Sequence, residues 1–228
     1  MSAQAITLKG KGKQKTGIRW GRLLWTIFVV LYFINFTKNL FADVAPGRAA
    51  IPIIYFVLWL CWLGVEFYLS ALFFQSSLVP RFNPWLKASF AVYFYGLQGL
   101  AGWDAFGGTQ IHFLYPLFNV IGLLIFALGI VIRLGALLVY LRTKDRNRIL
   151  ASRPWQMSRH PRYVGMLLIM FAIPLVFFSP WAMLATVVIG LPLWYLSVRF
   201  EERKLKSQWG NVYEDYCKTT PLRPRLRH

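Results

Sequence analysis

Two short polar stretches flank one apolar part of the chain and carry side chains that could do chemistry. The first contains Arg159, His160 and Pro161, and the second is the pair Glu201 and Glu202. An imidazole or a carboxylate can accept a proton, and a carboxylate can also hold a cationic or hydroxyl-bearing ligand. These residues predict a polar ligand site if the fold brings the two stretches together.

The stretch around His160 is typical of a helix start. Pro161 suits the first turn of a helix, where its missing N–H is not needed. The free backbone N–H groups of such an end, with Arg159, His160 and Tyr163 beside them, would bind a carboxylate or phosphate. The alternative is an interfacial anchor, because Arg, His and Tyr side chains commonly lie at the level of lipid headgroups.

The glutamate pair predicts two different contacts. Neighbouring residues on a helix point about 100° apart. One of Glu201 and Glu202 can therefore face the His160 turn, while the other can face Arg199, Arg203 or Lys206. The alternative is an ion-pair cluster at the membrane interface.

Glu66 and Arg133 are ionisable residues inside apolar runs. Such groups face the protein interior or a cavity and avoid lipid. They could therefore pair with each other or line a substrate cavity, and Arg133 could also extend toward the cytoplasm.

Tyr213 and Tyr216 are spaced to share one face of an amphipathic tail, 204–217. The alternative is that this face only docks the tail under the rest of the protein. Cys61 and Cys217 do not suggest a disulfide framework. The sequence contains no glycine-rich phosphate loop, metal-ligand spacing or nucleophile elbow, so no metal site is expected.

The elements that must position these residues are membrane helices. The 228 residues are 57% hydrophobic and 15% charged, with a mean hydropathy of +0.48. The net charge of +18 comes from basic residues between the apolar runs. That placement favours orientation in a bilayer and attraction to anionic lipid over nucleic-acid binding.

The apolar runs predict an all-α, polytopic membrane bundle of about six spans. We expect a basic, flexible cytoplasmic arm over 1–19, four spans within 20–149, and a hairpin with a cytoplasmic amphipathic tail over 150–228. The predicted spans are 20–41, 50–74, 85–103, 111–141, 163–178 and 181–198. The last two are short and antiparallel, so the start of the fifth should meet the end of the sixth.

The loop charges predict the orientation. If six spans alternate, every Lys and Arg except Lys38, Arg48 and Arg133 lies on one side of the membrane. Because cytoplasmic loops carry an excess of positive charge, both termini are expected in the cytoplasm. The His160 turn and the glutamate pair then lie on the cytoplasmic face.

The spacing of these motifs resembles a known family. The matching residues are Leu150, Pro154, Arg159, His160, Pro161, Tyr163 and Gly165 before the hairpin, and Glu201, Glu202, Leu205, Gly210, Tyr213 and Tyr216 after it. Together they resemble the isoprenylcysteine carboxyl methyltransferases and the related phospholipid methyltransferases. The resemblance covers about the last 75 to 95 residues, and the first four spans carry no comparable match.

This resemblance implies an S-adenosylmethionine-dependent methyltransferase acting on a small lipophilic acceptor at the cytoplasmic membrane face. The implied cofactor-binding residues are Arg159, His160, Pro161, Tyr163, Glu201, Glu202, Tyr213 and Tyr216. The implied catalytic candidates near the head of the acceptor are Arg199, Arg133 and Glu66.

Two other functions remain open. The family usually has Gly-Pro-Tyr before the Arg-His-Pro turn, whereas this chain has Arg153, Pro154 and Trp155. A non-catalytic membrane subunit, with protein partners in a larger assembly, would explain the loss of that glycine. Sterol reductases share a similar C-terminal hairpin and use NADPH, although their chains are longer.

Overall fold

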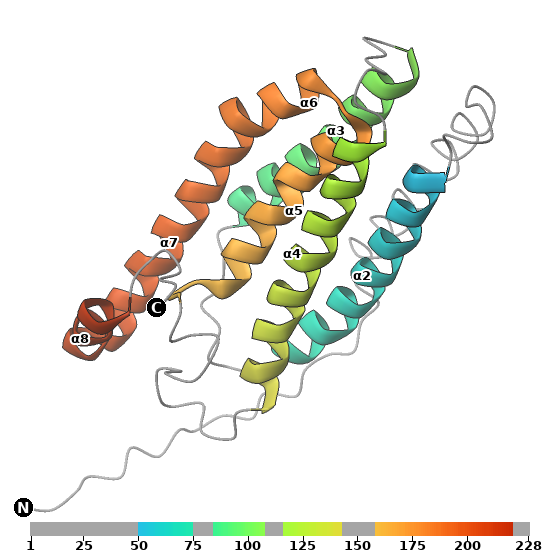
Figure 1. Ribbon diagram of the computed structural model, residues 1–228. Helices are drawn as coiled ribbons and strands as arrows, with labels where there is room; N and C mark the ends of the chain where they lie inside the picture. The colour runs from blue at the N-terminus through green and yellow to red at the C-terminus, as the bar shows by residue number, and fades with distance from the viewer. Residues whose placement is uncertain (1–49, 75–83, 108–115, 143–157, 221–228) are drawn as a thin grey trace, which may run out of the picture. The chain divides into compact units, whose positions relative to one another are not determined.

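The computed structural model describes residues 50–74, 84–107, 116–142 and 158–220. Every regular element in these ranges is a helix, which confirms the all-α prediction for this part of the chain (Figure 1). The predicted arm and the first predicted span, 20–41, lie outside the described residues.

The helices follow the chain in a simple order. They are α2 (Ala50–Phe74), α3 (Pro84–Gly107), α4 (Leu117–Arg142), α5 (Pro161–Phe177), α6 (Pro180–Ala185), the π-helical turn η1 (Thr186–Gly190), α7 (Leu191–Trp209) and α8 (Asn211–Thr219). The bounds of α2 are those predicted, and α3 continues beyond the predicted end at 103. Helix α4 begins directly after a turn at Pro116, and residues 111–115 lie outside the described part.

The sixth predicted span, 181–198, lies within a longer helix. One continuous helical segment of 30 residues runs from Pro180 through η1 to Trp209. The π-helical turn η1, which ends two residues before Pro192, changes the hydrogen-bonding register, so the proline falls in the first turn of α7 and does not end the helix. Beyond the apolar run, Arg, Glu, Lys and Leu are good helix formers, so the helix continues through Glu201 and Glu202.

Two described helices, α4 and the Pro180–Trp209 segment, are long and apolar enough to cross a membrane. The apolar parts of α2 and α5 are shorter. Apolar side chains remain exposed along α4 and η1, among them Leu124 at 65%, Val131 at 66% and Val188 at 61%. Exposed apolar faces of this extent are unfavourable in water and suit lipid, so the described helices indicate a membrane protein.

The α4–α5 contact depends on glycine. A Cβ atom placed on Gly165 would lie 2.6 Å from the carbonyl oxygen of Gly129 and 2.8 Å from the backbone nitrogen of Arg133. A Cβ on Gly129 would lie 2.8 Å from the carbonyl oxygen of Gly165. The two backbones therefore approach as closely as glycine permits, which is typical of helix pairs in membranes.

The turn between α5 and α6 is closed by polar contacts. Phe178 adopts a left-handed conformation with φ of 49°, and Ser179 then caps α6 by accepting from the Ala182 N–H at 3.1 Å. The Ser179 hydroxyl also donates to the buried Asp104 carboxylate of α3 at 2.6 Å. This turn joins α5 to an antiparallel α6–α7 segment, so the far end of α7 returns to the start of α5 (Figure 1).

Ser179→Ala is expected to destabilise the protein by about 1–2 kcal/mol, because it removes both the helix cap and the donor to Asp104. The measurement is thermal unfolding in detergent. Ser207→Ala is the matched control, since the Ser207 hydroxyl donates only to the Lys204 carbonyl on an exposed face. Equal losses in the two variants would contradict the capping role.

Candidate functional site

The start of α5 forms one wall of the candidate site. Pro161 occupies the first turn, as predicted, and the His160 carbonyl accepts from the N–H groups of Tyr163 and Val164 at 3.0 and 3.1 Å. The His160 N–H donates to the Ser158 hydroxyl at 3.2 Å. The His160 side chain is only 3% exposed, so the imidazole is fixed inside the protein and is not an interfacial anchor.

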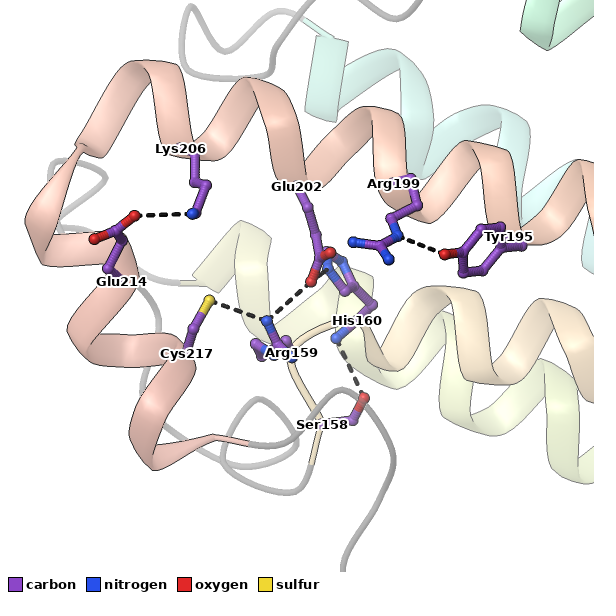
Figure 2. A network of polar contacts seen from close by, with 9 residues as sticks. All are labelled: Ser158, Arg159, His160, Tyr195, Arg199, Glu202, Lys206, Glu214 and Cys217. Carbon is purple, nitrogen blue, oxygen red and sulfur yellow. Dashed lines mark hydrogen bonds and ion pairs between the residues drawn. The ribbon is translucent and has the colours of Figure 1, made fainter.

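Glu202 of α7 closes the site from the other side. Figure 2 shows its carboxylate between Arg159 and His160. Glu202 Oε1 accepts from Arg159 Nη1 at 2.9 Å and lies 3.6 Å from His160 Nε2. The prediction that one glutamate faces the His160 turn is confirmed, because the hairpin returns α7 to the start of α5.

The partner predicted for the other glutamate is wrong. Glu201 does not turn outward to Arg199, Arg203 or Lys206, because its carboxylate lies against the Tyr163 hydroxyl of α5. Because neighbouring residues on a helix point about 100° apart, Glu201 meets a different part of the α5 surface from Glu202. Both glutamates therefore face the start of α5. Glu202 lies at His160, and Glu201 lies at Tyr163, three residues further along the chain.

Arg199 lies at the edge of this cluster. Its Nε donates to the Tyr195 hydroxyl at 2.7 Å, and its guanidinium carbon lies 5.2 Å from the centre of the Tyr195 ring. The side chain is exposed on α7 and lies near Glu202 (Figure 2). The structure therefore places Arg199 beside the site and not inside it.

Glu66 and Arg133 pair with each other, which was one of the two predicted roles for these residues; the other was to line a substrate cavity. Arg133 Nη2 and Nε donate to the two Glu66 oxygens at 2.5 and 2.8 Å, and Trp62 Nε1 donates to Glu66 at 2.9 Å. Arg133 Nη1 also donates to the Arg162 carbonyl at 3.2 Å. This network joins α2, α4 and the first turn of α5. Its contact on α5 is the carbonyl of Arg162, the residue before Tyr163.

The tail covers the site from the C-terminal end of α7. The predicted tail, 204–217, contains a break at Gly210, whose φ of 52° suits glycine, and α8 begins after it. The Tyr213 and Tyr216 rings share one face, as predicted, with centroids 6.1 Å apart. Cys217 Sγ accepts from Arg159 Nη1 at 3.0 Å (Figure 2).

The two tyrosines are neutral at physiological pH. Burial raises the pKa of Tyr216 to about 12, and burial also raises the pKa of Tyr213 above its ordinary value. The Tyr213 hydroxyl, in a side chain that is 3% exposed, therefore remains a hydrogen-bond donor.

Several buried polar atoms of this cluster make no hydrogen bond. They are Arg159 Nε, Glu201 Oε2, His160 Nε2, which stays 3.6 Å from Glu202, and the Tyr213 hydroxyl, which has only the weak acceptor Cys217 Sγ beside it. Buried polar groups are normally paired, and leaving one unpaired costs about 1–3 kcal/mol. A concentration of them on α5, α7 and α8 indicates a place prepared for a polar ligand.

Sequence reasoning missed three contributors to this arrangement. Trp194 Nε1 donates to the Tyr163 carbonyl at 2.8 Å, Ser158 holds the His160 backbone, and Cys217 contacts Arg159. Of these three residues, only Cys217 could have been predicted from the sequence, because it lies four residues after Tyr213 and therefore on the same helical face.

Residues 117–212 match the sequence model of the phospholipid methyltransferase family. The match begins at the first residue of α4 and ends within α8, so it contains the α5–α7 hairpin, Arg133 and both glutamates. Glu66, Tyr213 and Tyr216 lie outside it. No curated protein sequence matches the chain. The family match confirms the predicted resemblance, and the apolar helices indicate a membrane protein.

Proposed function

We propose that this protein binds S-adenosylmethionine between the start of α5, α7 and α8, and methylates a small lipophilic acceptor at the cytoplasmic membrane face. The observation that carries this proposal is the group of buried, unpaired polar atoms within and beside the family-matched hairpin. A structural ion-pair cluster alone would leave fewer of its buried groups without partners.

The residues present fit the chemistry of this cofactor. The unpaired Glu201 oxygen is an acceptor suited to an ammonium group or a ribose hydroxyl. Arg159 Nε and the Tyr213 hydroxyl are donors suited to a carboxylate. When bound, S-adenosylmethionine supplies a methyl group on a positively charged sulfur, which the acidic residues of the site tolerate.

The protein's contribution is alignment and exclusion of water. In-line displacement needs a fixed geometry more than a strong base if the acceptor is a carboxylate or thiolate. Helix α8 covers the site with two tyrosines and limits access of water. An amine or phenol acceptor would have to lose a proton, and His160 or Glu201 would be the base.

The route of the acceptor follows from the membrane setting. A lipophilic molecule would enter laterally between helices and place its head near Arg133, Glu66 or Arg199. Six spans with both termini in the cytoplasm, as the loop charges favour, would present this head to the cofactor site on the cytoplasmic side.

Calorimetric titration of the purified protein with S-adenosylhomocysteine tests the proposal. Binding is expected, and His160→Ala and Glu201→Gln should each weaken it by about tenfold or more, because each removes a polar group that a bound cofactor would satisfy. Arg203→Gln is the matched control on the exposed side of α7 and should leave affinity unchanged. Thermal unfolding of each variant checks that it is folded.

The other outcomes are equally informative. Absence of binding by the folded wild-type protein, or equal affinity in all variants, would overturn the proposal. Absence of binding together with stable copurification of a larger assembly would favour a non-catalytic subunit, the alternative motivated by Arg153, which lies outside the described residues. Binding of NADPH would instead favour a reductase.

A further inference from the structure

Cys217 occupies a junction between three elements. Its sulfur accepts from Arg159 Nη1 at 3.0 Å, and the same nitrogen donates to Glu202 at 2.9 Å (Figure 2). Cys217 belongs to α8, Arg159 precedes α5, and Glu202 belongs to α7. The residue Cys217 is partly exposed, which gives a small reagent a route to it from solvent.

Two buried donors beside this sulfur lack a strong acceptor. One is Arg159 Nε, on the guanidinium group that contacts the sulfur. The other is the Tyr213 hydroxyl, one helical turn before Cys217, which has only the weak thiol sulfur of Cys217 beside it as an acceptor. Tyr213 is 3% exposed, so water does not replace the missing acceptor. A thiol sulfur is a weak acceptor, whereas an oxygen bonded to it would be a strong one.

We propose that Cys217 is a site of reversible oxidation, at which Arg159 and Tyr213 bind the oxygen of a cysteine sulfenic acid. The oxidant is a hydroperoxide. The sulfur attacks the terminal peroxide oxygen, the S–O bond forms and the O–O bond breaks. The thiol proton leaves with the alcohol or water that departs. Sulfur is oxidised by two electrons, the peroxide is reduced, and a thiol reductant reverses the change.

Oxidation would oppose cofactor binding, a consequence that rests on the proposed function. Arg159 and Tyr213 are the donors that fit the cofactor's carboxylate, and a sulfenic oxygen would engage the same two groups. Because the two ligands would compete for the same donors, bound cofactor should protect Cys217 from oxidation, and oxidation should weaken cofactor binding.

The test uses the full chain carrying Cys61→Ser, which leaves Cys217 as its single cysteine. The protein is treated with hydrogen peroxide, trapped with dimedone, and analysed by mass spectrometry. A dimedone adduct is expected on Cys217, at a yield several-fold higher than in variants that also carry Arg159→Met or Tyr213→Phe. Tyr213→Phe keeps the ring and removes only the hydroxyl, so it tests the donor without removing the packing.

No adduct, or equal yields in all three proteins, would overturn the proposal. The labelling needs no cofactor. Its dependence on Arg159 and Tyr213 therefore tests the oxidation site independently of the proposed methyltransferase function. Where calorimetry shows that S-adenosylhomocysteine binds, saturating ligand should lower the yield several-fold. Unchanged labelling of the ligand-bound protein would overturn the coupling between oxidation and the cofactor site.

Discussion

Gly165→Ala is expected to destabilise the protein by about 3 kcal/mol, the upper part of the usual range for overpacking. The new Cβ would overlap the Gly129 carbonyl and the Arg133 backbone nitrogen, and neither can move without displacing α4. The destabilisation should appear even though alanine favours a helix over glycine by about 1 kcal/mol. Moving α4 away from α5 would also draw the Arg133 guanidinium from the Arg162 carbonyl. Thermal and chemical unfolding in detergent measure the effect.

Gly135→Ala, on the neighbouring helix α4, provides the control. A Cβ at Gly135 meets no atom within 4 Å, so only the helix propensity changes, and a gain of about 0.5–1 kcal/mol is expected. The two identical substitutions on packed helices should therefore act in opposite directions. A loss of stability at both positions would contradict the prediction that Gly165 is needed for the close approach of α4 and α5.

The parts of the site that could be predicted are those for which only one arrangement of the side chains is physically favourable. Glu66 and Arg133 stand in apolar runs and can escape lipid only by facing the interior, where each is the natural partner of the other. Glu202 and His160 stand at the two ends of a hairpin whose connection is short, so any antiparallel packing brings them together.

The parts that could not be predicted depend on helix rotation and backbone detail. The apolar run marks where lipid contact ends, but the backbone of α7 continues as helix to Trp209, so hydropathy underestimates its length. The rotation of α7 decides that Glu201 meets Tyr163, and the π-helical turn before Pro192 contributes to that rotation. The position of Cys217 depends in turn on the break at Gly210.

Glu66→Met and Arg133→Met are each expected to destabilise the protein by about 3–5 kcal/mol, because each leaves a buried charge without its partner. The side chains are only 14% and 17% exposed, so water can compensate little. The double variant should recover most of the loss, since two apolar side chains of similar size can replace a buried ion pair. A double-mutant cycle on unfolding free energies measures the coupling, and additive losses would contradict a direct pair.

The same double variant separates a structural role from a catalytic one. If the pair only joins α2 to α4 and α5, a folded double variant should bind S-adenosylhomocysteine and transfer radiolabelled methyl groups to a membrane lipid extract as the wild-type protein does. If either charge binds the head of the acceptor, binding of S-adenosylhomocysteine should persist while transfer falls at least tenfold. The structure favours the first result, because Arg133 and Trp62 both donate to Glu66 and Arg133 also holds the Arg162 carbonyl. A group whose hydrogen bonds are already used in this way can take a ligand only by giving up a partner.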